Sequence, residues 1–284
     1  MSENLSAEQI DEMKRFSWKI RMEAIKCIAA FGLGHVGGSM SIADVLSVLY
    51  SGEMAIDPAN PKWEGRDRLV LSKGHCAPAL YATLALKGFF PMDWLTTMNQ
   101  NGTNLPSHAD RLKVPGIDMT AGSLGQGGSV AAGMALAFKM DDKPNNVYVI
   151  FGDGESQEGQ VWEMALFAPQ HRLDNLIAFV DYNKLQLDGF CDDIIAMGDM
   201  AAKFRDFGWY TINLEDGNDV VAIHDAIEEA KAQTTGKPTM IILNTVKGLG
   251  WSEIAGKTNS HAPSVSQEQL SEALAEMQSA YDAI

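Results

Sequence analysis

One strand–turn–helix–strand unit near the middle of the chain constrains the fold more than any other feature. An apolar run at 146–151 leads directly into Gly152-Asp153-Gly154, and a second apolar run at 176–180 leads into Asp181-Tyr182-Asn183. Short apolar runs that end in turn residues predict buried parallel strands joined by a helical crossover. Asp153 and Asn183 should then lie just past the carboxyl ends of two strands, where doubly wound sheets bind their ligands.

The residue types after the two strands indicate which ligand to expect. Asp153 offers a carboxylate oxygen, Asn183 an amide oxygen, and a backbone carbonyl near Leu185 could add a third oxygen. Magnesium prefers such oxygens and completes its coordination with phosphate oxygens and water. Gly152 and Gly154 carry no side chain, so a diphosphate can approach the backbone closely. The alternative is an ordinary Asp-Gly turn and, separately, an Asn that caps a loop.

The rest of the chain alternates between strand and helix patterns. Ser6 and Gln9 form a capping-box pattern before a long amphipathic helix. Further strands are predicted at 67–72, 209–214 and 239–245, and further helices at 78–87, 129–139, 219–233 and 266–281. The glycine-rich stretch 32–39 is expected to be irregular, with Ser41 capping a helix that runs to Tyr50. This alternation predicts one α/β domain over 1–284, with three α/β/α layers and a mostly parallel sheet.

The composition of the chain argues against several classes of function. The chain has 284 residues, 46% of them hydrophobic, and a net charge of −15, which argues against nucleic acid as a partner. No apolar run is long enough to cross a membrane, and residues 1–5 show no export signal. Cys27, Cys76 and Cys191 are too few and too scattered to predict a disulfide framework or a zinc site. A cytoplasmic protein without membrane contact is expected.

Several motifs along the chain together resemble those of one enzyme family. Asp153-Gly154, followed thirty residues later by Asn183, looks like the thiamine diphosphate-binding motif, and its flanking residues are similar to the transketolase version. His35, His75 and His108 stand in contexts that resemble transketolase elements, as does Gly122-Ser123-Leu124-Gly125-Gln126-Gly127. The resemblance keeps its order from about residue 13 to 263. It therefore indicates a transketolase rather than thiamine diphosphate enzymes in general.

The resemblance implies a site made of three groups of residues. Asp153, Asn183 and the Leu185 carbonyl would hold Mg²⁺, with Ca²⁺ or Mn²⁺ as alternatives. His35 and His108 would face the sugar, Glu158 would face a partner subunit, and His261 would join them in the catalytic group. Thiamine diphosphate would be bound by His75, Gly122, Leu124, Gly154, Glu155, Asn183, Leu187 and Lys247. His171 and His224 fall on predicted helices and are interpreted as structural.

Departures from full-length transketolases point to a two-chain enzyme. Val36-Gly37-Gly38-Ser39, Ser123 and Lys247 all look like residues of transketolases split into N-terminal and C-terminal subunits. The resemblance then implies a separate C-terminal partner that carries the glutamate activating the cofactor, in an α2β2 assembly. The expected reaction is transfer of a two-carbon ketol unit between a ketose and an aldose, either of which could carry phosphate.

Three other functions remain open from the sequence alone. One is the alpha subunit of a 2-oxo acid dehydrogenase, although the three loop histidines suit a polyol better than a 2-oxo acid. A second is deoxyxylulose phosphate synthase, which keeps its domains on one longer chain. A third is a non-catalytic partner protein that binds magnesium diphosphate and only regulates.

Overall fold

The protein is described by a computed structural model that covers residues 5–284. Its centre is a parallel sheet of β1 (Arg68–Leu71), β2 (Val147–Gly152), β3 (Leu176–Asp181), β4 (Tyr210–Leu214) and β5 (Thr239–Leu243), in the order β1-β2-β3-β5-β4. Every predicted strand is present. The expectation of no export signal concerns residues 1–5, of which 1–4 lie outside the described part.

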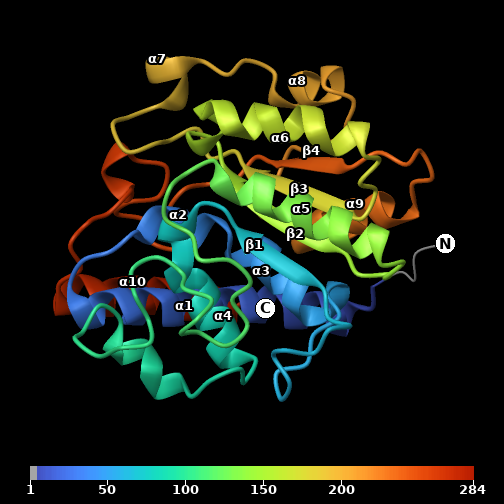
Figure 1. Cartoon of the computed structure of the whole chain (residues 1–284). Helices are drawn as coiled ribbons and strands as arrows, with labels where there is room; N and C mark the ends of the chain where they lie inside the picture. Colours follow the sequence, from blue (N-terminus) through green and yellow to red (C-terminus); the bar gives the residue numbers. More distant parts are fainter. Residues whose placement is uncertain (1–4) are drawn as a thin grey trace.

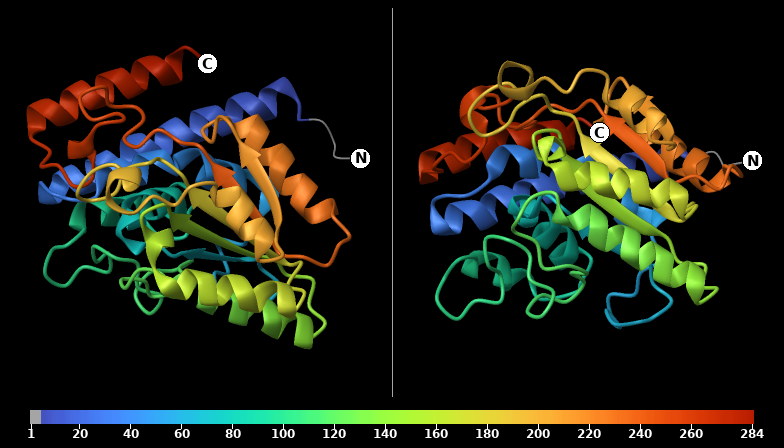
Figure 2. Two further views of the ribbon diagram at one scale, coloured as in Figure 1. Left: turned by 90° about the horizontal axis from the view of Figure 1, so that it is seen from above. Right: turned by 45° about the horizontal axis from the view of Figure 1, so that its top comes forward.

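Helices cover both faces of the sheet (Figure 1). One face packs against α5 (Gln126–Met140), α6 (Gly159–Gln170) and α8 (Met200–Asp206). The other carries α1 (Ala7–Phe31), α3 (Ala43–Val48), α4 (Ala77–Leu86), α9 (Val220–Ala232) and α10 (Gln267–Asp282). In Figure 2 the red helix α10 runs along the blue helix α1, so the two ends of the described chain share one layer. This is the predicted three-layer arrangement.

The strands divide the core because their side chains alternate between the faces. In β2, Tyr148 and Ile150 join the cluster under α1, whereas Val149 and Phe151 join the cluster under α5 and α6. All four side chains have no exposed surface. A strand buried on both faces reads as a continuous apolar run, which is why β2 and β3 show no polar alternation in the sequence.

The long first helix forms as predicted and begins at a complete capping box. The Ser6 hydroxyl accepts from the Gln9 N–H at 3.2 Å, and the Gln9 side chain accepts from the Ser6 N–H at 2.9 Å. Gly32 ends the helix in the left-handed region, with a φ of 90°. Short elements complete the described chain: α2 (Val36–Ser41), η1 (Leu49–Glu53), η2 (Gly74–Cys76), η3 (Met92–Thr97), η4 (Glu155–Gln157), α7 (Cys191–Ile195) and η5 (Thr258–Ser260).

The prediction for residues 32–50 was wrong in two respects. Part of the glycine-rich stretch is the helix α2, and Ser41 is the last residue of that helix rather than the cap of the next one. A Cβ at Gly37 would lie 2.6 Å from the Ser260 carbonyl oxygen, and one at Gly38 would lie 2.7 Å from the Cys76 sulfur. The glycines therefore permit close packing of α2 and do not mark a flexible loop.

Candidate functional site

The predicted site residues meet in one cavity of about 400 Å³ at the carboxyl ends of the strands. Asp153 follows β2, Asn183 follows β3, His75 follows β1 and Lys247 follows β5. Loops bring the remaining residues to the same rim. The cavity is lined by every residue predicted for the site: His35, His75, His108, Gly122, Leu124, Asp153, Gly154, Glu155, Glu158, Asn183, Leu185, Leu187, Lys247 and His261. Convergence of segments so distant in sequence is what an open parallel sheet provides.

Three oxygen donors suitable for a hard cation lie together in this cavity. The Asp153 carboxylate is 2% exposed and accepts hydrogen bonds from the Gly154 N–H at 2.8 Å and from the Lys184 N–H. Burial, followed by the charge of Asp181, raises the pKa of Asp153 to about 6. A carboxylate that is costly to ionise without a partner is suited to a cation. Residues 5–284 contain no group of three or more His, Cys, Asp and Glu placed to hold a metal.

Asn183 is held in one orientation by a buried carboxylate that sequence analysis did not single out. Asp181 is fully buried at the end of β3, and its Oδ2 accepts from Asn183 Nδ2 and from Ser41 Oγ, each at 2.7 Å. Lys73 Nζ donates to the same oxygen, and Thr245 Oγ1 donates to Oδ1. We call these five residues the Asp181 cluster. With Nδ2 engaged, the Asn183 amide is fixed so that Oδ1 accepts from the Leu185 N–H at 3.1 Å and keeps one further lone pair, which could serve a cation.

Charges within the Asp181 cluster support one another. Burial lowers the pKa of Lys73, but the Asp181 carboxylate more than offsets this and the pKa is raised overall. Burial likewise opposes ionisation of Asp181, yet Lys73 and the hydroxyl donors hold its pKa below the usual value. The pair is therefore ionised, and a buried ion pair of this kind is tolerated where further hydrogen bonds satisfy it.

Four histidines that line the same cavity form a group of neighbouring rings. The ring centroid of His35 lies 5.0 Å from that of His75, 5.9 Å from that of His108 and 5.2 Å from that of His261. His75 and His261 are 5.3 Å apart. The three histidines with a shared sequence context are thus brought together, and His261 joins them from the far end of the chain.

All four imidazoles have lowered pKa values. Burial, followed by the charge of Lys73, lowers the pKa of His75 to about 2, and burial, followed by Lys247, lowers that of His261 to about 4. Burial also lowers the pKa values of His35 and His108. Each ring is therefore neutral near pH 7, with one N–H donor and one acceptor nitrogen. Positive charge in the cavity comes from Lys73 and Lys247.

Lys247 connects the oxygen donors to the histidines. Its Nζ donates to the Leu185 carbonyl oxygen at 2.8 Å and lies 3.1 Å from His261 Nδ1. An ammonium group only donates, so Nδ1 accepts and the proton of the neutral His261 ring is on Nε2.

Glu155 and Gly154 shape the wall beside Asp153. The Glu155 carboxylate is 3% exposed and accepts from Ser72 Oγ at 2.5 Å, from the Gly125 N–H at 2.9 Å and from the Gly152 N–H at 3.0 Å. It therefore fixes the loop at the start of α5, and its direct contact with a cofactor stays a prediction. A Cβ at Gly154 would lie 2.8 Å from the Gln186 Cβ, so only glycine fits there without a shift.

Two of the other predicted residues are exposed at the mouth of the cavity. Leu187 is 64% exposed, and Glu158, the residue before α6, is also exposed with no hydrogen bond from its side chain to the helix N-terminus.

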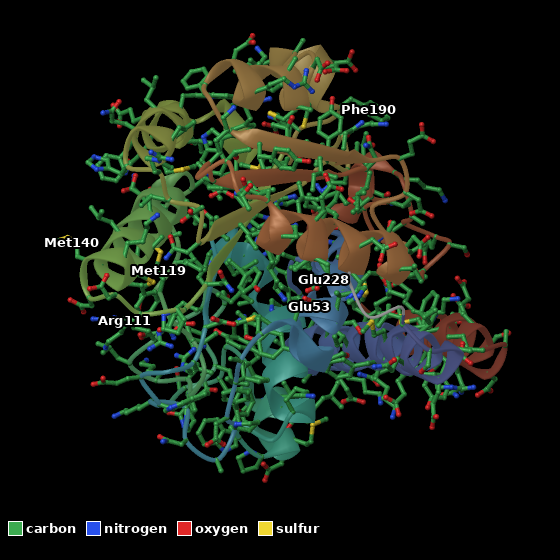
Figure 3. All side chains as sticks on the ribbon, turned by 90° about the vertical axis from the view of Figure 1, so that its right-hand side faces the viewer. Glu53, Arg111, Met119, Met140, Phe190 and Glu228 are labelled. Carbon is green, nitrogen blue, oxygen red and sulfur yellow. The ribbon has the colours of Figure 1, made fainter. Side chains whose placement is uncertain are left out.

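The two histidines interpreted as structural lie outside the cavity lining. His171 follows α6, and His224 is buried in α9 against Glu53. Glu53 and the nearby Glu228 are labelled in Figure 3.

Comparison with known proteins identifies the family. Residues 13–281 match the family described as transketolase, thiamine diphosphate binding domain. The chain belongs to the transketolase family. It is 52% identical over 274 residues to the 6-deoxy-6-sulfo-D-fructose transketolase subunit SqwG of Clostridium sp. (strain MSTE9), covering 96% of this chain and 98% of that protein. It is 36% identical to an apulose-4-phosphate transketolase subunit of Phocaeicola vulgatus, with 95% of each chain covered.

Solved transketolase structures agree with this assignment. The chain superposes on 44% of a Pichia stipitis transketolase chain, with a TM-score of 0.86, 31% identity and 96% of this chain covered. For a Leishmania mexicana transketolase the TM-score is 0.87, with 28% identity, 99% of this chain and 45% of that chain. The predicted family and its α/β fold are confirmed, and the chain is a transketolase subunit rather than part of a 2-oxo acid dehydrogenase. This chain covers 98% and 95% of the length of the two related subunits, but less than half of the length of the two solved transketolase chains.

Membership of this family identifies the cofactor and implies that a partner subunit exists. A thiamine diphosphate-binding domain binds thiamine diphosphate, and relatives that are named as subunits imply a partner subunit. Across residues 5–284, no helix combines the length and the apolar character required to cross a bilayer.

Proposed function

We propose that this chain holds the diphosphate end of thiamine diphosphate, through Mg²⁺, in a two-chain transketolase that moves a two-carbon ketol unit from a ketose to an aldose. The observation that carries the proposal is the single cavity in which the oxygen donors, two buried ammonium groups and four neutral histidines face one another. Ca²⁺ and Mn²⁺ are alternative ions for the same oxygens. The protein would act as one domain over 1–284, because both core clusters share one sheet.

The residues present fit the proposed cofactor. Asp153, Asn183 Oδ1 and the Leu185 carbonyl would hold the cation, while Lys247 and His75 would donate to the diphosphate. Gly122, Leu124 and Leu187 would contact the rings, with Gly154 against the diphosphate. When bound, thiamine diphosphate supplies a carbon centre that accepts the two-carbon unit and stabilises the negative charge formed on cleavage. His35, His108 and His261 would orient the sugar by donating hydrogen bonds to its carbonyl and hydroxyl oxygens.

The names of two relatives indicate the class of donor. One is named for 6-deoxy-6-sulfo-D-fructose and the other for apulose-4-phosphate, both ketoses with an anionic end. We propose that this chain serves a ketose with an anionic end as well. A sulfonated ketose is placed first because the identity to that relative is 52%. For the partner we propose a cytoplasmic C-terminal subunit, in an α2β2 complex.

A transfer assay tests this function. The chain would be mixed with a transketolase C-terminal subunit, thiamine diphosphate, MgCl₂ and an aldose phosphate acceptor. Donors would be 6-deoxy-6-sulfo-D-fructose, fructose 6-phosphate, fructose, and a 2-oxo acid with an artificial electron acceptor. We expect transfer from the two anionic ketoses, little from fructose and none from the 2-oxo acid. Oxidation of the 2-oxo acid without ketol transfer would overturn the proposal.

Two histidines should separate sugar binding from cofactor binding. His108→Ala removes a donor from the sugar side of the group, so we expect kcat/KM for the ketose to fall about a hundredfold while the Kd of thiamine diphosphate stays constant. His75→Ala should instead raise that Kd. Calorimetric titration and steady-state kinetics measure the two effects, with His171→Ala as the control outside the cavity. Identical behaviour of His108→Ala and His75→Ala in both assays contradicts the proposed roles.

A further inference from the structure

A second cavity, of about 840 Å³, lies near the opposite end of α5 from the cofactor site. Its lining includes Met134, Ala137 and Phe138 near the end of that helix, and Arg68 at the first position of β1. Gly125, at the start of α5, belongs to the loop fixed by Glu155. Phe138 is thirteen residues after Gly125, which corresponds to roughly 20 Å of helix. Figure 3 shows Arg111 and Met119 on the same side of the molecule as Met140, the last residue of α5.

This second cavity is strongly basic, although the whole chain is acidic. Five cationic side chains line it, and only one acidic side chain does: Lys62, Arg66, Arg68, Arg111 and Lys113 against Asp118. The net charge of the chain is −15. Cations concentrated in this way on an acidic protein raise the local concentration of anions.

The single carboxylate lies against two of the five cations, Arg66 by direct hydrogen bonds and Arg68 at 3.6 Å. Asp118 is 9% exposed, and its Oδ2 accepts from Arg66 Nη1 at 3.0 Å and from the Leu69 N–H at 3.0 Å. Arg66 Nη2 donates to the other carboxylate oxygen. Arg66 and Asp118 therefore form a neutral, buried unit. The four remaining cations have no equivalent partner of their own in the lining.

Arg68 is held at the cavity wall with part of its guanidinium group free. Nη1 donates to the carbonyl oxygens of Arg66 and Asp67, and Cζ lies 5.5 Å from the centroid of the Phe138 ring. Within residues 5–284, Nη2 makes no hydrogen bond, and Nε is 3.6 Å from Asp118 Oδ1. Burial and the charge of Arg66 lower the pKa of Arg68, as expected where positive charge is in excess.

Arg111 and Lys113 add two exposed cations from the loop above. Neither side chain forms an ion pair within residues 5–284. Asp110, the nearest acid in sequence, instead accepts from the Leu112 N–H at 2.9 Å and from Thr120 Oγ1 at 3.1 Å. Met134, Ala137 and Phe138 provide an apolar floor below these cations. A volume of about 840 Å³ is within the range typical of small-molecule sites.

We propose that this second cavity is a binding site for a small phosphate-bearing anion, distinct from the cofactor site and contacted by Arg68, Arg111 and Lys113. Guanidinium groups bind phosphate through paired N–H donors, and Lys113 adds a point charge. Free phosphate and a phosphorylated metabolite share this chemistry.

Calorimetric titration tests this site. Pyrophosphate, inorganic phosphate and fructose 6-phosphate would be titrated into the full chain with saturating thiamine diphosphate and Mg²⁺, so that the cofactor cavity is filled. We expect the double variant Arg111→Ala/Lys113→Ala to weaken pyrophosphate binding by about tenfold, because two of the four uncompensated cations are lost. We also expect wild-type affinity to fall as NaCl is raised. Comparison of the three titrants distinguishes free phosphate from a phosphorylated sugar.

The matched control is Lys203→Ala/Arg205→Ala. These two cations are also exposed, also two residues apart, and lie in the last turn of α8 away from the cavity. The proposal requires that this variant bind pyrophosphate as the wild type does. Equal affinity of the wild type and Arg111→Ala/Lys113→Ala, or an equal loss in both double variants, overturns it. Failure of the cofactor itself to bind would contradict the proposed function instead, because the difference between variants does not depend on it.

Discussion

Replacement of Asp153 by alanine is expected to abolish binding of thiamine diphosphate. The variant loses the only carboxylate among the three proposed metal donors, so the cation that neutralises the diphosphate is no longer held. We expect the Kd to rise by about a hundredfold or more, which corresponds to about 3 kcal/mol. Calorimetric titration of thiamine diphosphate with MgCl₂ measures the effect. Unchanged affinity would show that the cation, or the cofactor, is held elsewhere.

The unfolding stability of the ligand-free protein shows whether a substitution at Asp153 has damaged the fold. The folded-state pKa of Asp153, about 6, lies above its ordinary value, so the folded protein binds this proton more tightly than the unfolded chain does. The contribution of Asp153 to stability is therefore full below about pH 4 and is lost as the pH rises through 6. At pH 7.5 the isosteric Asp153→Asn should unfold in urea no earlier than the wild type, and yet fail to bind the cofactor. Asp206→Ala, an exposed acid at the end of α8, should change neither property.

The second large effect expected is dependence on a partner. With cofactor and magnesium, the purified chain alone should transfer ketol units at less than about a thousandth of the rate seen with a C-terminal subunit, because the proposed partner would supply the carboxylic acid that activates the cofactor. Titration of this chain with the C-terminal subunit should saturate at equal concentrations. Light scattering should then report two copies of each. Full turnover by the isolated chain would contradict this prediction.

Exposed apolar side chains beside the cavity support a partner at this place. Leu187 is 64% exposed, Phe190 is 47% exposed and Ile195 is 55% exposed, and all three lie in the segment after β3. Phe190 is labelled in Figure 3 at the edge of the molecule. Apolar side chains gathered at the rim of a polar site are typical of protein interfaces.

Glu158 tests where the partner contacts the site. Its side chain lines the cavity, is exposed, and makes no hydrogen bond in the described part of the chain. Glu158→Gln should lower the rate of the assembled enzyme without changing the urea midpoint of this chain, whereas Glu163→Gln, at an exposed position on α6, should leave the rate unchanged.

The sheet could be predicted from sequence because its signal is local. Each of the five strands is a short apolar run that ends in turn residues, and each was expected within two residues of its observed bounds. The oxygen donors could be placed for the same reason, since position after a parallel strand determines which edge a residue reaches. Asp153 and Asn183 therefore converge as expected.

Residues whose role depends on packing could not be predicted in this way. Gly37 and Gly38 look like a loop in sequence, and only their contacts with Ser260 and Cys76 show why a helix needs them. Lys73 and Asp181 are ordinary charged residues in sequence, because burial and pairing are properties of the folded chain. The one available signal was position, because Lys73 is two residues before His75 and Asp181 is two residues before Asn183.

The Asp181 cluster has a consequence for the order of folding. Its hydrogen bonds join Asp181 to residues 140, 108 and 64 positions away: Ser41, Lys73 and Thr245. Contacts at such sequence separations form only after large loops have closed, which makes them slow and late. Asn183 is only two residues from Asp181, but Asp181 itself is held in place by Ser41, Lys73 and Thr245, so the proposed metal donor Asn183 is fully oriented only once the sheet is assembled. Newly made subunits would thus become able to take up cofactor only at the end of folding, and cofactor uptake would select completely folded copies.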